Sequence, residues 1–295
     1  MEHLSSCPIC GCPDSTPAHT CTDHTVTGAR FTIQQCLGCG LYFTNPRPAR
    51  NKIGDYYLSE NYISHAAKAR TLRDHLYHWV RRRAIKGKHN LIRSHVEHGR
   101  LLDIGCGTGS FLAYMKEVGY DVQGVEVSTA ARQVAQEKQI TVVEELGKIP
   151  ETDRFDVITL WHVLEHVPDP LQTMKEVFHR CAPGGLLVVA VPDRSSWDCS
   201  HYGVDWAAWD VPRHLFHFQG QDVQRLFKTT GFTPLETRKM WFDAPYVAML
   251  SEQHRGAGPI ASLIKGAAIG LWSNGVAWAN GRPTSSSLYL AKKTK

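Results

Sequence analysis

Long apolar runs are missing from this sequence. No stretch reaches about 18 consecutive apolar residues, which excludes a membrane-spanning helix. Residues 1–6 also lack a basic segment leading into an apolar one, so no signal peptide is expected. A strong charge of either sign is absent too: the formal net charge is +5 over 295 residues, which does not by itself argue for an anionic partner. We therefore expect a globular, cytoplasmic protein that is not integral to a membrane.

Cysteine is plentiful but unevenly placed. Six of the nine cysteines precede residue 40, and four of them form two Cys-x-x-Cys pairs. Without an export signal, such pairs indicate metal ligation rather than disulfides. Each pair puts two thiolates on one tight turn, and two turns supply the four sulfurs of a structural zinc site. We predict a zinc ribbon over residues 1–48 that acts as a structural clip, with ligands Cys7, Cys10, Cys36 and Cys39.

The segment after the cysteine-rich module has a different pattern. Two prolines within residues 45–48 break any regular element and close the module. Residues 49–98 then predict a helical connector and cap, whose long basic helix covers roughly residues 65–98 and includes the run Arg81–Arg83. Such a basic run is more often a solvated face than a nucleic-acid site.

From residue 99 onward, short apolar runs alternate with helical segments. This alternation is typical of a parallel sheet covered by helices on both faces. We expect a doubly wound α/β domain over residues 99–295, with a mostly parallel seven-stranded sheet. The runs that predict strands are 101–104, 122–126, 140–143, 155–160, 186–191, 234–240 and 286–291.

A glycine-rich turn follows the first of these strands. Residues 101–109 read Leu-Leu-Asp-Ile-Gly-Cys-Gly-Thr-Gly and lead into a helix predicted over residues 110–117. Glycines permit close approach of a ligand, and a helix N-terminus presents free N–H groups. The next strand ends in Glu126, placed to bind ribose hydroxyls. A dinucleotide dehydrogenase would carry a third glycine where this chain has Ser110.

This motif resembles the first motif of class I S-adenosylmethionine-dependent methyltransferases, and the resemblance extends over about residues 99–245. It implies a Rossmann-like methyltransferase fold and an S-adenosylmethionine cofactor. The contact of the third strand with adenine stays open among Glu144, Glu145 and Leu146. The cofactor-binding residues that the resemblance implies are Asp103, Gly105, Cys106, Gly107, Gly109, Glu126, Val127, Trp161 and His162.

Residues 191–218 carry many aromatic and histidine side chains and follow the fifth strand of the domain. Ligands in open α/β sheets bind beyond the carboxyl ends of the strands, so this segment is expected over the site. Any single tryptophan here is best explained as core, whereas the cluster favours a substrate site. His214 is the preferred general base and His217 the second candidate.

One apolar stripe lies outside these motifs. Apolar residues repeat at helical spacing over residues 259–272, inside a lid insertion expected near residues 245–283. Packing against the protein's own core is the default interpretation. A lid, a homodimer helix and an interfacial membrane helix are the alternatives.

The expected function is methyl transfer to a small-molecule acceptor through oxygen, carbon or nitrogen. The four-cysteine module resembles that of deoxysugar C-methyltransferases, although Arg213 replaces their glutamate. Residues 164–170 resemble quinone-type O-methyltransferases; there we expect His166 to pack or cap the loop. A nucleic-acid methyltransferase is the alternative, but residues 161–164 lack the tetrad of its amine-methylating members. A non-catalytic S-adenosylmethionine-binding protein is the third hypothesis.

Overall fold

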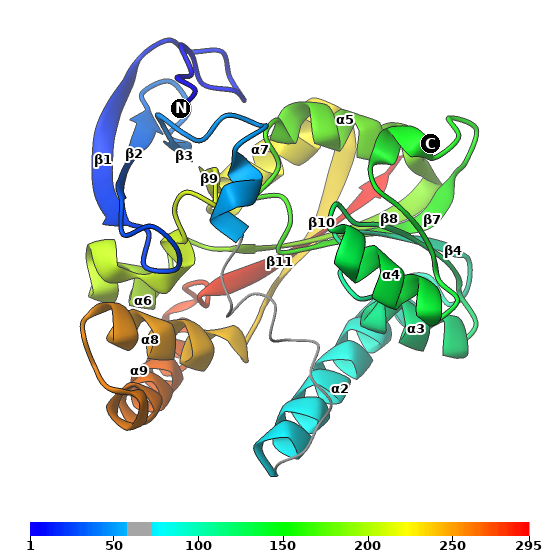
Figure 1. Ribbon diagram of the computed structural model, residues 1–295. Helices are drawn as coiled ribbons and strands as arrows, with labels where there is room; N and C mark the ends of the chain where they lie inside the picture. The colour runs from blue at the N-terminus through cyan, green and yellow to red at the C-terminus, as the bar shows by residue number, and fades with distance from the viewer. Residues whose placement is uncertain (58–71, 295) are drawn as a thin grey trace.

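The computed structural model describes residues 1–57 and 72–294, and it contains two sheets (Figure 1). The larger has seven strands in the order β10-β11-β8-β7-β4-β5-β6. β11 runs antiparallel to both β10 and β8, and the other neighbours are parallel. The expected doubly wound, mostly parallel seven-stranded sheet is therefore confirmed. Its strands are β4 (Arg100–Ile104), β5 (Asp121–Val125), β6 (Thr141–Val143), β7 (Phe155–Trp161), β8 (Cys181–Pro192), β10 (Phe232–Lys239) and β11 (Ser286–Lys293).

Helices cover both faces of this sheet because successive strand residues point to opposite sides. Leu101 in β4 packs with α2 (Leu72–Arg93), α3 (Ser110–Glu117) and α4 (Thr129–Glu137). Its neighbour Leu102 belongs to the opposite core, with α5 (Pro170–Arg180) and α7 (Gly220–Thr230). The continuous apolar runs of the sequence are explained by this burial on both sides. The basic connector helix begins at residue 72 and ends at 93, and the part expected over residues 65–71 lies outside the described residues.

The smaller sheet joins the cysteine-rich module to a distant segment. Its order is β1-β2-β3-β9, and β3 pairs antiparallel with β9. Its strands are β1 (Ser15–Thr22), β2 (Arg30–Cys36), β3 (Tyr42–Thr44) and β9 (Phe216–His217). The sheet therefore takes its fourth strand from the aromatic and histidine-rich segment, about 170 residues further along the chain.

That segment also supplies most of a third apolar core. Trp206 and Trp209 are buried there against Phe31 and Ile33 of β2. Both indole N–H groups are satisfied, by Asp198 and by the carbonyl of Gly203. The core interpretation of these two tryptophans is therefore correct. Short helices complete this region: η1 (Ile53–Tyr57), α6 (Trp197–Tyr202), η4 (Gly203–Asp205) and η5 (Ala207–Trp209).

The insertion between β10 and β11 is a helical hairpin of α8 (Asp243–His254) and α9 (Pro259–Asn280). The expectation that the apolar stripe of α9 packs on the protein's own core is wrong. Small residues face α8 instead: a Cβ on Gly266 or Gly270 would lie 2.4 Å from the backbone of Met249 or Pro245. This close helix contact turns the large apolar side chains of α9 outward. Among the described residues, no helix combines the length and hydropathy needed to cross a bilayer.

Candidate active site and metal centre

The glycine-rich turn joins β4 to α3 and adopts a left-handed backbone, with φ of 71° at Gly105 and 54° at Gly107. A Cβ at Gly105 would lie 2.4 Å from the side chain of Val163, and one at Gly109 would lie 2.9 Å from Ala135. At Gly107, by contrast, a Cβ would meet nothing within 4 Å. Two glycines thus serve close packing, while the middle one borders open space that a ligand can enter.

The side chain of Cys106, between the first two glycines, points away from this open space. Its side chain is buried in the core below the turn, against Gly124 and Leu112. Of the cofactor-binding residues implied by the resemblance, this one can meet a ligand only through its backbone.

Glu126 stands on the rim of the turn at the end of β5. One carboxylate oxygen accepts the N–H of Gly107 at 2.9 Å, and the other accepts the N–H of Ser128 at 2.8 Å. These bonds fix the carboxylate and leave further lone pairs for hydroxyl donors. The neighbouring Val127 is 83% exposed, so its side chain is available to an aromatic ring. This geometry fits the predicted ribose and adenine contacts.

Asp103 and Lys88 bring opposite charges to the same end of the sheet. Asp103 is buried and accepts a 2.6 Å hydrogen bond from Thr159. Burial raises the pKa of Asp103 to about 7, against the effects of Thr159 and the Lys88 cation. The Lys88 ammonium lies 3.9 Å from the centre of the Trp161 ring, whose buried Nε1 has no hydrogen-bond partner among the described residues. A carboxylate, an ammonium and an unpaired donor suit a zwitterionic amino-acid group such as the methionine part of the cofactor.

His162 follows Trp161 at the end of β7 and has a strained backbone, with φ of 56°. Its Nδ1 lies 3.4 Å from Glu165 Oε1, and its Nε2 lies 3.3 Å from Asp243 Oδ2 at the start of α8. Although burial opposes protonation, these two carboxylates raise the pKa of His162 to about 10. The imidazolium therefore ties the helical hairpin to the loop after β7.

A second charged cluster lies in that loop. Glu165 is 1% exposed, and apart from the 3.4 Å ion pair between Oε1 and His162, neither carboxylate oxygen has a hydrogen-bond partner among the described residues. Ligand atoms of Glu165, His166 and His214 all lie within 4.8 Å of one another. Burial disfavours its charged form, but the surrounding histidines, His162 above all, lower the pKa of Glu165. An ionised buried carboxylate beside imidazoles can stabilise a proton or hold a cation.

The backbone contacts both histidines in this cluster. Nδ1 of His214 is 2.9 Å from the carbonyl of Ala208; because a carbonyl only accepts, this Nδ1 carries the proton and Nε2 of His214 keeps its lone pair. Nδ1 of His166 is 3.0 Å from the carbonyl of Arg213 and 3.0 Å from the hydroxyl of Tyr57. His166 thus does contact the loop backbone as expected. Burial and the nearby His214 also lower the pKa of His166 to about 4.

His217 occupies a different environment, in β9 of the smaller sheet. The Thr44 hydroxyl donates to the carbonyl of His214 at 2.9 Å, so it accepts from Nε2 of His217 at 3.1 Å. Burial holds the pKa of His217 well below its usual range. This histidine braces the strand that follows His214, whereas His214 itself lies beside the carboxylate of Glu165.

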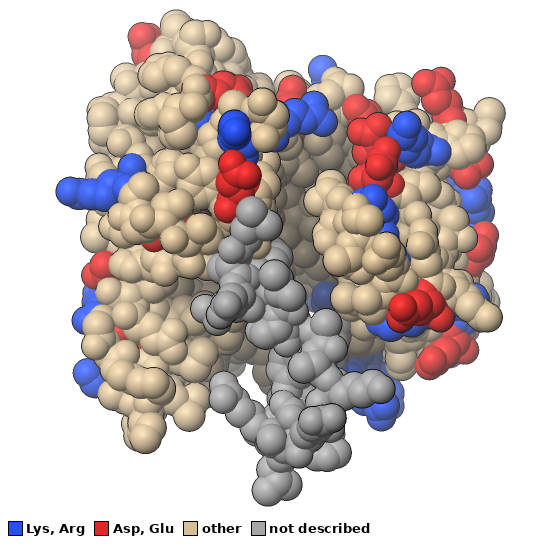
Figure 2. Space-filling view, in the orientation of Figure 1, with Lys and Arg blue, Asp and Glu red and all other residues tan. Residues whose placement is uncertain are grey.

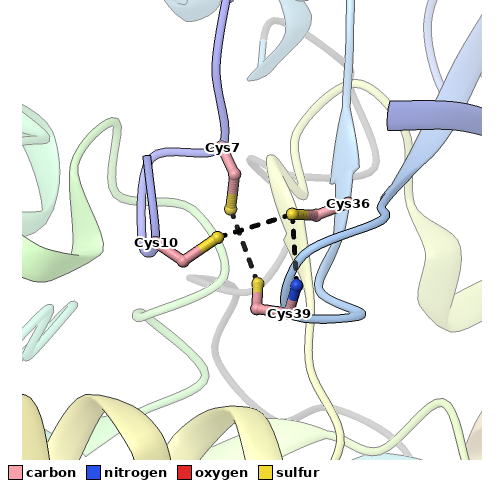
Figure 3. Close-up of side chains that lie close together, drawn as sticks. All are labelled: Cys7, Cys10, Cys36 and Cys39. Atoms are coloured by element: carbon pink, nitrogen blue, oxygen red, sulfur yellow. Dashed lines mark hydrogen bonds between the residues drawn. The ribbon is translucent and has the colours of Figure 1, made fainter. Parts of the chain in front are cut away.

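The four predicted zinc ligands converge, with their sulfurs pointing toward one another (Figure 3). Cys7 and Cys39 have sulfurs 3.6 Å apart, and Cys10 and Cys36 have sulfurs 3.5 Å apart. A tetrahedral site with zinc–sulfur bonds of about 2.3 Å has sulfur–sulfur edges of about 3.8 Å. Burial opposes ionisation of Cys36, but hydrogen bonds from its neighbours, led by the Cys39 N–H, lower the pKa of its thiol to about 7. The cluster fits a zinc ribbon.

Sequence reasoning missed several residues of the site. Lys88 lies in α2, where the sequence indicated a basic helix but no binding motif. Asp243 begins α8, in an insertion that carries no motif. Glu165 stood in a stretch that resembles quinone-type enzymes and could have been found there. In the orientation of Figure 1, the space-filling view shows a hollow at the upper centre of this face, between the side that holds the smaller sheet and the side that holds α4 (Figure 2).

Comparison with known proteins identifies the family of this chain. The family model described as "Methyltransferase domain" matches residues 76–237. A ubiquinone biosynthesis O-methyltransferase from Alkalilimnicola ehrlichii is 37% identical over 111 residues, which cover 34% of this chain and 44% of that protein. The enzyme of the same name from Cereibacter sphaeroides is 29% identical over 160 residues, which cover 49% of this chain and 64% of that protein. The chain therefore spans about half to two thirds of the length of these curated relatives.

One solved structure resembles almost the whole chain. The Burkholderia thailandensis 1,6-didemethyltoxoflavin-N1-methyltransferase, crystallised with 1,6-didemethyltoxoflavin and S-adenosylhomocysteine, has 16% sequence identity and a TM-score of 0.51. The match covers 94% of this chain and all of that one, and it supports the fold alone. Because the family model matches more than half of the residues, this chain belongs to the methyltransferase-domain family.

Proposed function

We propose that this protein transfers a methyl group from S-adenosylmethionine to a hydroxyl of a small organic acceptor. The observation that carries the proposal is the placement of two sites on adjacent strands. The open glycine turn with Glu126 follows β4 and β5, and the Glu165–His214 cluster lies in and against the loop after β7, the neighbour of β4. The proposed site for a nucleoside cofactor and the proposed proton-accepting group therefore lie at the same end of the sheet.

The cofactor, when bound, supplies a methyl group that its sulfonium already activates. The protein's own residues then have three tasks. Glu126 and Asp103 orient the cofactor, and the loop after β7 aligns the acceptor, which removes much of the entropic barrier. His214 accepts the hydroxyl proton at Nε2, because its Nδ1 is committed to Ala208. The resulting imidazolium is stabilised by Glu165 and by Asp210, whose carboxylate lies 3.9 Å from Nε2.

The choice of oxygen over carbon or nitrogen rests on the base and on the named relatives. An amine acceptor could enter neutral and would not need His214. For a deoxysugar C-methyltransferase, the residue before the histidine would be an acid, whereas Arg213 is engaged in buried ion pairs with Asp23 and Asp210. The curated relatives are ubiquinone biosynthesis O-methyltransferases, which favours a phenolic hydroxyl.

The zinc ribbon is the second part of the proposal. We propose that Cys7, Cys10, Cys36 and Cys39 hold one structural zinc ion. The support is the convergence of their sulfurs at separations that a tetrahedral site requires. No catalytic step is assigned to this metal, because four thiolates fill a tetrahedral site and leave no open ligand position.

The test is a transfer assay with methyl-labelled cofactor, combined with calorimetric binding. The acceptor panel contains a catechol, a primary amine, a deoxysugar nucleotide and transfer RNA. We expect label in the catechol and loss of cofactor binding in Glu126→Ala, but not in the exposed Glu137→Ala. Label in the amine, or on a carbon atom of the sugar, overturns the choice of oxygen, and label in RNA supports the nucleic-acid alternative. Binding without turnover of any acceptor supports a non-catalytic protein.

A further inference from the structure

The outer face of α9 carries large, exposed apolar side chains that the candidate site does not use. At the lower left of Figure 1, α9 forms the edge of the molecule beside α8. Its 22 residues extend for about 33 Å at 1.5 Å per residue. Six of its large apolar side chains are more than half exposed: Ile260, Leu263, Ile264, Leu271, Trp272 and Trp278.

This face has almost no polar groups. Among the exposed positions of α9, only Lys265 and the terminal Asn280 carry polar side chains. Protein–protein interfaces surround an apolar centre with a polar rim, and α9 contributes only these two polar groups to such a rim. Contiguous exposed apolar surface of this kind marks an interaction site.

The charges of the hairpin point to the kind of partner. Lys265 is its most exposed charge, at 62%, whereas Glu252, 3.9 Å away, is only 8% exposed. The other charged groups are less exposed and are paired, Asp243 with His162 and Arg255 with Asp205. An apolar face whose most exposed charge is a lysine complements an anionic lipid bilayer, which attracts lysine near its headgroups.

Aromatic side chains strengthen this assignment. Trp241 and Phe242 precede α8 and are 41% and 68% exposed. Asn274 of α9 donates to the carbonyl of Trp241 at 2.7 Å, which places this residue beside the C-terminal half of α9. Tryptophan is favoured at the boundary between water and lipid because its ring is apolar and its N–H is polar.

We propose that the α8–α9 hairpin lies on an anionic membrane surface, with the outer face of α9 in the headgroup region. Because α8 begins at Asp243, which contacts His162, the lipid-facing surface starts beside the candidate site. An apolar acceptor dissolved in the bilayer would reach the site along this edge. Delivery of the acceptor rests on the proposed function, whereas binding to lipid does not.

The test is flotation of the full-length protein with vesicles, without cofactor or acceptor. One set contains phosphatidylcholine alone and the other phosphatidylcholine mixed with phosphatidylglycerol. We expect binding to the mixed vesicles that weakens with salt. The double variant Leu271→Asp/Trp272→Asp should reduce the partition coefficient by roughly tenfold or more. The control Leu235→Asp, at an exposed apolar position on β10, should bind like wild type.

The same variants test whether the protein is folded and whether a second copy of the chain covers the face of α9. Retained binding of S-adenosylmethionine shows that the double variant is folded. Lys265→Glu should remove the preference for phosphatidylglycerol. The proposal is overturned if wild type floats with neither vesicle, or if the double variant floats unchanged. It is equally overturned if light scattering shows a dimer that the double variant dissociates, because a second copy then covers the face.

Discussion

Arg213 and Asp23, 190 positions apart in the sequence, form a buried ion pair with 3.0 Å between Nη1 and Oδ1. Their side chains are 2% and 0% exposed. The same guanidinium binds Asp210 through two nitrogens and donates to the carbonyl of Tyr56. One side chain thus joins the cysteine-rich module, the connector and the loop that carries His214.

Removal of this cation should destabilise the protein strongly. Arg213→Met leaves Asp23 and Asp210 without their shared partner, and loss of one member of a buried pair costs about 3–5 kcal/mol. Urea unfolding followed by circular dichroism measures the change. The exposed Arg82→Met is the matched control and should unfold like wild type. Equal midpoints for Arg213→Met and wild type would show that the pair contributes nothing net.

The cysteine cluster should contain one zinc ion per chain after purification without added metal. Cys36→Ala/Cys39→Ala should lose the metal and melt at a lower temperature, because metal binding contributes directly to the stability of so small a module. Elemental analysis and calorimetry measure both effects. Cys12→Ala, outside the cluster, should keep the zinc. Zinc retained by the double variant contradicts the assignment.

Lys88 should bind the carboxylate of the cofactor's methionine part. Lys88→Met keeps the stem over Trp161 but removes the charge, and a lost charge-assisted hydrogen bond is worth about 1.5–3 kcal/mol. We expect weaker binding of S-adenosylmethionine and unchanged binding of 5′-methylthioadenosine, which has no carboxylate. Titration calorimetry with both ligands decides the question. An equal loss for both would assign Lys88 to packing.

His214 should act as the general base for a hydroxyl acceptor. His214→Ala should lower kcat by roughly 10²–10⁴-fold with little change in cofactor affinity. The comparison is His217→Ala, which should mainly lower thermal stability because His217 braces Thr44 in the smaller sheet. Single-turnover kinetics and melting curves separate the two effects. If kcat falls only in the His217 variant, the two roles are exchanged.

His166 should make the protein less stable in acid. Its pKa is about 4 in the folded state and about 6.5 when unfolded, so the unfolded chain binds the proton first as pH falls. The stabilisation is complete above pH 6.5 and is lost toward pH 4. His166→Gln should therefore show a smaller drop in melting temperature between pH 7 and pH 5 than wild type. The exposed His179→Gln should follow wild type, and parallel curves for all three would contradict this origin.

Local patterns predicted the elements of the large sheet well. The predicted strands begin and end within one or two residues of the observed strands, except that β8 begins earlier than predicted. The predicted helix over residues 110–117 matches α3. Burial on both faces makes such strands continuously apolar, and a glycine turn before a helix is a local signal. The cysteine spacing likewise predicted which four sulfurs lie together in the structure.

Contacts between residues far apart in the sequence could not be predicted from local patterns. The pairing of β3 with β9 depends on two short strands about 170 residues apart, and neither has a distinctive pattern. The face of α9 was misjudged because periodicity shows that a stripe exists but not what covers it. Here glycine and serine pack against α8, so the small residues are the buried ones. Lys88 and Asp243 reach the site only through tertiary structure.

The strand β9 also bears on how this architecture can be taken apart. Residues 1–48 provide three strands of the smaller sheet, and the fourth belongs to the loop that carries His214. A catalytic fragment that begins after residue 48 would expose Phe216, because its partner strand β3 is removed. Arg213 would lose its ion-pair partner Asp23, and the carbonyl of His214 would lose the hydrogen bond from Thr44. The cysteine-rich module is therefore an integral part of the fold and cannot be removed without disturbing the loop that carries His214. Recombination between such proteins would have to exchange both segments together to keep an active loop.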